Sequence, residues 1–243
     1  NLVLRIPKSI DVIEGRQDFG SFASYAFEGE GNGVEIVDKM FVNNRKDGSR
    51  VLLEVDPKMV EDGVLTIPEG ITALGVGALS YVEADKIILP KGLTAIGQDA
   101  FFESTVKEIV TPSTLKQLGE QAFNNASKLE KVTLPESIET LPYGCFMCCE
   151  SLSSIVLPQT LKVLGEKAFY YCHALTQITL PEGLEEMGEY ALGWTGITEL
   201  TIPNSCTKFH VSGMDNLTTL TLPAGLTELP KGGFEGMRSL VSV

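Results

Sequence analysis

Cysteine and histidine are the residues of this chain best suited to metal binding or nucleophilic catalysis. Cys145, Cys148 and Cys149 are close enough in sequence to suggest a metal-binding knuckle. Nucleophilic catalysis needs a nucleophile, a base and an orienting group, and the chain has only two histidines, His173 and His210. It carries no motif of a serine hydrolase, a phosphate-binding loop, a dinucleotide site or a zinc protease. We therefore expect no catalytic residue, no cofactor and no bound metal.

Carboxylates are numerous but scattered along the chain. A local acidic cluster is formed by Glu182, Glu185, Glu186 and Glu189. Calcium takes oxygen ligands of this kind, but no Asp-x-Asp-x-Asp loop accompanies them. We expect a solvated acidic surface at this cluster.

Composition and charge favour a folded protein with an aliphatic core. Of the 243 residues, 43% are hydrophobic and only 7% aromatic, and the formal net charge is −13. Nucleic acid and anionic lipid both attract basic surface, so neither is an expected partner. No apolar stretch approaches the roughly 20 residues of a membrane span. The sequence starts at Asn1 without a recognisable signal peptide, and its five cysteines are a poor disulfide framework.

Regularly spaced prolines reveal an internal repeat. Successive intervals are 22, 22, 23, 23, 23, 22 and 20 residues, from Pro68 through Pro90, Pro112, Pro135, Pro158, Pro181 and Pro203 to Pro223. The residues three and one before the proline are apolar, as in Leu65/Ile67 and Val132/Leu134. A period of two indicates a short strand with one buried face. Proline ends that strand because it cannot donate to a ladder.

The second half of each unit has a different pattern. Two more apolar residues follow the proline, and then usually a glycine such as Gly97, which suits a tight turn with positive φ. Next comes a small residue and a bulky one, as in Ala100-Phe101. We interpret this pair as a short helical turn whose bulky side chain points inward and stacks on its copies. The bulky positions are Leu79, Phe101, Phe123, Phe146, Phe169, Leu192, Met214 and Phe234.

This alignment gives the cysteines a packing role. Cys145 occupies the small-residue position, and Cys149 and Cys172 share the column of Ala126. We therefore expect small buried thiols without a disulfide or metal. Only Cys148 falls in a variable position that favours exposure.

One unit cannot bury its own apolar face, so the units must stack. About eight coils then form a rod, with neighbouring strands ~4.8 Å apart in one parallel sheet and the helical turns opposite. Crossover connections between parallel strands favour a right-handed superhelix. The sequence therefore predicts an α/β repeat solenoid over residues 62–243.

The two ends of the chain are less regular. Leu4–Pro7 begins another repeat whose Ala26-Phe27 pair comes late, after an insertion near Gly15–Tyr25. Strands over Val34–Asn43 and Arg50–Val55 are predicted to form a hairpin around Asp47-Gly48. We interpret residues 1–61 as an atypical coil plus hairpin that caps the solenoid. At the other end, residues 240–243 stop where the next strand would begin, so we expect either a longer native chain or a partner covering this edge.

The repeat resembles a known family. Leu152–Leu175 fits the unit L-x-x-I-x-L-P-x-x-L-x-x-L-G-x-x-A-F-x-x-C-x-x-L of BspA-type leucine-rich repeats. Departures include Thr111 before a proline, and Pro142 and His210 at glycine positions. The resemblance implies a leucine-rich repeat superhelix from a secreted or surface-associated bacterial protein. It also implies, as a partner, a host extracellular protein or glycan, because some BspA-like proteins are adhesins.

Two rows of side chains are candidates for binding. The outward residues of the strands are β-branched, among them Ile88, Val110, Thr133 and Val156, although strand propensity alone also favours such residues. The second row follows the inward bulky residue and contains Tyr81, Phe102, Met147, Tyr170, Tyr171 and Trp194. Aromatic residues that the repeat does not need are candidates for a protein or glycan contact. The alternative is that they lap over the neighbouring coil.

Three functions remain open on the sequence. The first is a non-enzymatic binding module, with an adhesin as its family-implied form. The second is a structural spacer or stalk that presents another domain. The third is an enzyme such as a glycoside hydrolase, which needs two carboxylates roughly 5–10 Å apart in a cleft. We expect the first, since a rod offers no obvious cleft.

Overall fold

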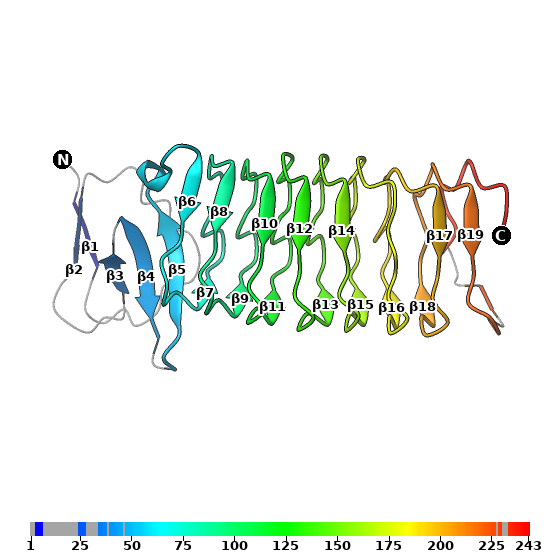
Figure 1. Cartoon of the computed structure of the whole chain (residues 1–243), viewed down its shortest axis with the longest axis horizontal. Coiled ribbons are helices and arrows are strands. Elements are labelled where there is room, and N and C mark those ends of the chain that lie inside the picture. The colour runs from blue at the N-terminus through cyan, green and yellow to red at the C-terminus, as the bar shows by residue number, and fades with distance from the viewer. Residues whose placement is uncertain are drawn as a thin grey trace.

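The chain forms an elongated solenoid in the computed structural model (Figure 1). The structure describes residues 3–6, 24–27, 34–37, 39–45, 47–226, 228–229 and 233–243, the first three segments by backbone alone. From β6 onward, each coil stacks on the one before it, and the coils follow one axis to the C-terminal end (Figure 1).

A first row of parallel strands precedes the repeat prolines. It comprises β6 (Val64–Thr66), β8 (Lys86–Ile88), β10 (Glu108–Val110), β12 (Lys131–Thr133), β14 (Ser154–Val156), β17 (Glu199–Thr201) and β19 (Thr219–Thr221). Copies of the repeat pair in register, as Leu65 with Ile87 and Val132 with Ile155. The middle residue of each strand is buried and the last is exposed, which confirms the expected period of two.

A second row of parallel strands lies on another side of the rod. Its members are β7 (Ala73–Leu74), β9 (Ala95–Ile96), β11 (Gln117–Leu118), β13 (Thr140–Leu141), β15 (Val163–Leu164), β16 (Glu186–Met187) and β18 (Lys208–Phe209). The prediction of a single parallel sheet was therefore wrong. The two apolar residues after each proline were recognised in the sequence, but a two-residue strand is too short to leave a periodic signal.

The predicted helical turns opposite the sheet are also wrong. Among the described residues the one helix is the 3₁₀ helix η2 (Pro57–Met59). The Ala-Phe segments instead alternate tight turns with bonds to the next coil: Phe102 N–H donates to Asp99 O (3.0 Å), whereas Phe101 N–H donates to Ala122 O (2.7 Å). Every second amide of this segment donates to the next coil. These amides are therefore not available for the consecutive hydrogen bonds that a helix requires.

The inward phenylalanines form the predicted ladder. Phe101, Phe123, Phe146 and Phe169 are each 0% exposed. Their rings stack in sequence, with centroids 4.7, 5.0 and 5.3 Å apart and interplanar angles of 11°, 8° and 5°. The ladder continues the aliphatic core from coil to coil, as a stacked repeat requires.

The turn glycines have a different role from the one predicted. Gly97, Gly119 and Gly188 do not adopt positive φ, but a Cβ on them would meet backbone atoms of the preceding coil at 2.7, 2.3 and 2.5 Å. Glycine is needed here because two backbones approach closely.

The N-terminal region confirms one predicted hairpin and corrects its extent. β4 (Met40–Asn44) and β5 (Arg50–Val55) are antiparallel around the expected turn. The strand predicted over 34–43 is divided in two, because a turn with Lys39 at φ 66° separates β4 from β3 (Val34–Val37). β5 pairs in parallel with β7, so this hairpin continues into the second strand row.

Before the hairpin, β1 (Val3–Ile6) pairs in parallel with β2 (Ser24–Phe27). The Ala26-Phe27 pair therefore lies in a strand and not in a helical turn. Most of the predicted insertion lies outside the described residues.

Each strand row has one interruption. In the second row, β11 and β13 belong to different sheets. Pro142 stands at the glycine position, whose N–H elsewhere bonds to the preceding coil, as Gly119 does to Ile96 O (2.7 Å). Proline has no N–H, so it removes this bond. In the first row the break falls between β14 and β17, and the strand predicted around Ile178 is not formed (Figure 1).

Candidate binding surfaces

Four aromatic rings from two adjacent coils meet on one edge of the rod. We call Tyr170, Tyr171, Tyr190 and Trp194 the aromatic cluster. Trp194 stacks on Tyr171 (centroids 5.4 Å apart, 10°) and on Tyr190 (5.6 Å, 25°), and contacts Tyr170 edge-on at 5.1 Å. All four side chains are half-buried. The rings therefore pack mainly on one another while each keeps some surface in contact with solvent.

The backbone at this edge explains how the rings are presented. Tyr171 and Trp194 occupy the second position after the inward bulky residue, where the backbone is left-handed, with φ of 61° and 54°. Bulky residues rarely adopt this conformation, which favours glycine and asparagine. Gly213 in the following coil makes room for the indole, since a Cβ there would lie 2.8 Å from Trp194 Cζ3. The equivalent position is left-handed in other coils too, at Glu103, Asn125 and Cys148, so the aromatic side chains and not the backbone distinguish these two coils.

The predicted aromatic row divides into separate groups. Tyr81, at 56% exposure, contacts the half-buried Phe102 edge-on at 5.4 Å. Met147 is half-buried on a coil between this pair and the aromatic cluster. Tyr190 was not among the predicted residues. It precedes the small residue of its coil, where other coils carry Asp99, Gln121 or Lys167, and an aromatic at this polar position was a usable signal.

Burial and mutual contact affect the phenol of Tyr170. Desolvation raises its pKa, and the neighbouring Tyr171 adds to the rise by repulsion and by a hydrogen bond. This hydroxyl is therefore a neutral donor and acceptor at physiological pH. Together with the indole N–H of Trp194, it adds directional polar groups to an apolar platform.

The outward residues of the first strand row are exposed as expected. Val110 and Val156 are 60% and 80% exposed, and Ile88 and Thr133 lie on the same face. Ion pairs flank this row between adjacent coils: Lys107 Nζ to Asp85 Oδ1 at 2.7 Å and Lys131 Nζ to Glu108 Oε1 at 3.5 Å. Exposed pairs of this kind contribute little stability, so they mainly set the charge pattern of the face.

The cysteines pack as the repeat alignment predicts. Cys145, Cys149 and Cys172 are buried, whereas Cys148 is half-buried. Cys149 Sγ donates to Phe123 O and Cys172 Sγ to Phe146 O, both at 3.1 Å, so each thiol ties its coil to the preceding one. Burial raises the pKa of the thiols of Cys145, Cys149 and Cys172. Buried protonated thiols are poor nucleophiles and poor metal ligands.

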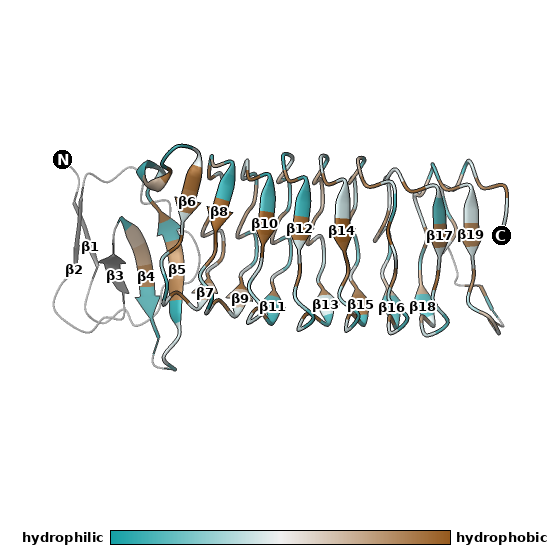
Figure 2. Cartoon of the chain, viewed as in Figure 1, coloured by the Kyte–Doolittle hydropathy of each residue, from teal (hydrophilic) through white to brown (hydrophobic). Residues whose placement is uncertain are grey.

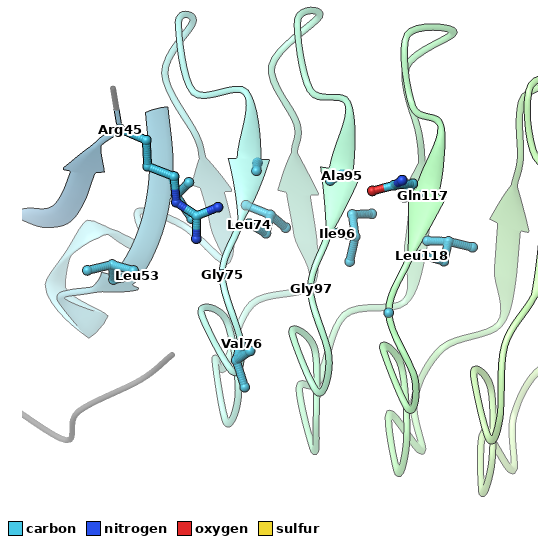
Figure 3. A pocket seen from close by; sticks show the side chains of 13 residues that line it. Arg45, Leu53, Leu74, Gly75, Val76, Ala95, Ile96, Gly97, Gln117 and Leu118 are labelled. Atoms are coloured by element: carbon cyan, nitrogen blue, oxygen red, sulfur yellow. The ribbon is translucent and has the colours of Figure 1, made fainter. Parts of the chain in front are cut away.

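A groove of about 590 Å³ runs over the second strand row near the N-terminal hairpin (Figure 3). It is lined by residues of adjacent coils, among them Leu74, Gly75, Ile96 and Gly97, and Arg45 projects over one end (Figure 3). Among the described residues that line it there is no carboxylate or histidine.

A second groove, of about 560 Å³, holds Glu166, Glu186, Glu189 and His210. Glu166 pairs with Lys167 and Glu186 with Lys208, and the carboxylates are exposed. The groove therefore lacks the enclosure that tunes a catalytic carboxylate. Across the described part of the chain, no group of three or more His, Cys, Asp or Glu side chains is arranged to hold a metal ion. In the same residues, no helix is long and apolar enough to cross a membrane.

The stacked parallel coils, with their aliphatic core and phenylalanine ladder, define a repeat solenoid of the leucine-rich repeat type. Six copies of the BspA type Leucine rich repeat region match residues 63–162, 96–212 and 139–243. The chain therefore belongs to this family, which confirms the resemblance noted in the sequence.

Two solved structures share the fold. A leucine-rich repeat protein from Eubacterium ventriosum matches with a TM-score of 0.63 at 22% identity, over 82% of this chain and 60% of its own length. Another from Bacteroides ovatus matches with a TM-score of 0.57 at 23% identity, over 86% and 76%. The chain thus spans about three fifths of the first protein. No curated protein sequence matches the chain.

Proposed function

We propose that the protein is a non-enzymatic binding module of a secreted or cell-surface bacterial protein, and that the aromatic cluster makes the principal contact. The observation that carries this proposal is the mutual stacking of the half-buried rings of Tyr171, Trp194 and Tyr190 on one edge of the rod. Clustered aromatic rings that keep part of their surface in solvent are typical of a recognition surface.

The chemistry of the cluster suits a host extracellular protein or a glycan. Stacked aromatic faces bind the apolar faces of sugar rings and the side chains of proteins, while phenol and indole groups supply hydrogen bonds. The family supports an extracellular location and an adhesive role. The open, ion-paired character of the acidic groove supports a role without catalysis.

Binding to a panel of immobilised extracellular-matrix proteins and mucin glycans tests this proposal. The native chain is expected to bind at least one component, and a Tyr171→Ala, Trp194→Ala variant is expected to bind it at least tenfold more weakly. Tyr81→Ala is the matched control, because it removes an exposed aromatic residue at the same position of another coil. Equal binding by the native chain and the double variant would reject the cluster as the contact.

The second candidate is a rigid spacer that presents another domain. It is favoured by the continuous cluster of buried side chains that extends from Met40 to Leu220 among the described residues. A native chain that binds no component of the panel would support the spacer.

A further inference from the structure

The groove of about 590 Å³ over the second strand row crosses four neighbouring strands. Its lining residues come largely from β5, β7, β9 and β11, which are adjacent in one sheet (Figure 3). Val51, Ala73, Ala95 and Gln117 pair in register across these strands, so their side chains share the outward face. Three strand spacings of ~4.8 Å give this row a length of about 14 Å. The groove therefore runs along the rod and has room for an extended chain molecule.

This part of the strand row is apolar because small side chains occupy its outward position. Ala73 and Ala95 lie at that position in β7 and β9, whereas its copies in β16 and β18 are Glu186 and Lys208. Figure 2 shows the same contrast, since β16 and β18 are hydrophilic teal. The groove therefore lies where the row presents methyl groups instead of charges.

The main-chain groups that line the groove are already hydrogen-bonded. Gly97 N–H donates to Leu74 O (2.9 Å), and Gly97 O accepts from Ala100 N–H (3.4 Å). Gly75 is bonded in the same way on both sides. A sugar or a peptide backbone buried here would leave its own polar groups unpaired, which costs free energy. A hydrocarbon chain has no such groups, so this lining favours an alkyl chain.

One end of the groove is cationic. Arg45 is exposed and projects over that end, opposite Gln117 (Figure 3). Arg45 forms no ion pair among the described residues, and the nearby Asp47 carboxylate accepts two hydrogen bonds from Ser49. Two residues before Arg45, the side-chain amide of Asn43 is buried with both polar atoms unpaired in the described part of the chain. The fold thus leaves a guanidinium and an amide unused at this end.

We propose that this groove binds a fatty acid, with its alkyl chain along the row of small side chains and its carboxylate against the guanidinium of Arg45. Burying the chain removes apolar surface from water, and guanidinium groups recognise carboxylates with paired hydrogen bonds. Charge sets the orientation, because Arg45 is the one charged side chain among the described residues that line the groove. The site is separate from the aromatic cluster and does not depend on the proposed function.

Octanoate is the probe for this site. Octanamide has the same chain with a neutral head, and butanoate has the same head with a shorter chain. Calorimetric titration of the native chain is expected to show saturable binding of octanoate. Octanamide is expected to bind about threefold more weakly, because an exposed ion pair adds little, and butanoate more than about tenfold more weakly, because it buries less apolar surface. Equal binding of octanoate and octanamide, or no saturable binding of octanoate at millimolar concentration, would overturn the proposal.

Two variants separate the head from the chain. Arg45→Gln is expected to bind octanoate as weakly as octanamide, because the charge preference is removed. Ala95→Phe fills the row and is expected to bind neither ligand. Thr140→Phe is the matched control, because it places the same ring at the same position of β13, outside the groove. Normal octanoate binding by a natively folded Ala95→Phe variant, or a preference for octanoate retained by Arg45→Gln, would contradict the site.

Spectroscopy of the native chain locates the bound ligand. Octanoate is expected to shift the methyl NMR signals of Ala73 and Ala95 while the emission of Trp194, the single tryptophan, stays unchanged. A shift in Trp194 emission with unchanged methyl signals would place the alkyl chain at the aromatic cluster and overturn the assignment to this groove.

Discussion

Replacing Phe146 by alanine tests the stacking of the core. The side chain is fully buried and its ring stacks on Phe123 and Phe169, at 5.0 and 5.3 Å. Removing a buried phenyl group forfeits its burial and leaves a cavity, which together cost about 3–5 kcal/mol. Since a domain is stable by only about 5–15 kcal/mol, the variant is expected to lose a large fraction of its free energy of unfolding.

Two further substitutions make this measurement specific. Phe146→Leu is expected to cost only about 1–1.5 kcal/mol, because Leu79 and Leu192 occupy the same inward position in other coils and are buried there. Phe102→Ala is the surface control, since Phe102 is half-buried outside the ladder and is expected to cost about 1 kcal/mol or less. Urea unfolding monitored by circular dichroism gives the three values, provided that the m-values agree. A cost below about 1 kcal/mol for Phe146→Ala would refute the argument that each ring supports its neighbours.

Two other predictions follow from close packing. Gly119→Ala is expected to lower the free energy of unfolding by about 1–3 kcal/mol, because its Cβ would meet Gln98 N at 2.3 Å. Gly92→Ala is the control and should change this free energy little, since a Cβ there would have nothing within 4 Å. Equal thermal stability of the two variants would contradict the prediction. Cys148 is expected to be the one thiol that a disulfide reagent modifies readily in the folded protein at pH 8, with five modified after unfolding; rapid labelling of two or more would contradict the burial described. Burial also raises the pKa of Cys206 from 9.0 to about 11. The protonated thiol therefore contributes to the free energy of unfolding below pH 9, and this contribution is lost as the pH rises through 11. Cys206→Ala is expected to make the free energy of unfolding less dependent on pH between 9 and 11.

The sequence predicted the solenoid because its strongest features repeat. The proline spacing, the period of two before each proline and the inward phenylalanines each reflect a contact that every coil makes with the next. Stacked coils repeat such contacts many times, so single departures such as Thr111 do not obscure them. The buried position of Cys149 followed from its column in the same way.

The features that the sequence missed depend on contacts between backbones. The tight segment around Phe101 resembled a helical turn because its amide bonds to Ala122 O leave no trace in residue types. The role of Gly119 depends on the approach of Gln98 N from the preceding coil, which repeat spacing does not reveal. The interruption of the first strand row at 176–179 was also not predictable from the sequence, because Ile178 matches the inward residue of intact strands. No side chain of this segment explains the interruption.

The aromatic cluster was only partly predictable. Tyr171 and Trp194 stood out because they occupy positions that the repeat does not need. Their grouping with Tyr190 depends on the tight turn that brings Tyr190 and Trp194 of one coil together, and on the stacking of that coil on the one that carries Tyr170 and Tyr171. Sequence columns therefore identify candidate residues better than they identify the surface those residues form.

The fluorescence of Trp194 tests the central claim of a binding surface at the aromatic cluster most directly. Trp194 is the single tryptophan of the chain, so its emission reports on this site without labelling. Titration with the component bound in the panel assay is expected to shift its emission and reduce its quenching by acrylamide, over the same concentration range as binding. Saturable binding with unchanged emission and unchanged quenching would place the contact elsewhere on the solenoid and contradict the claim.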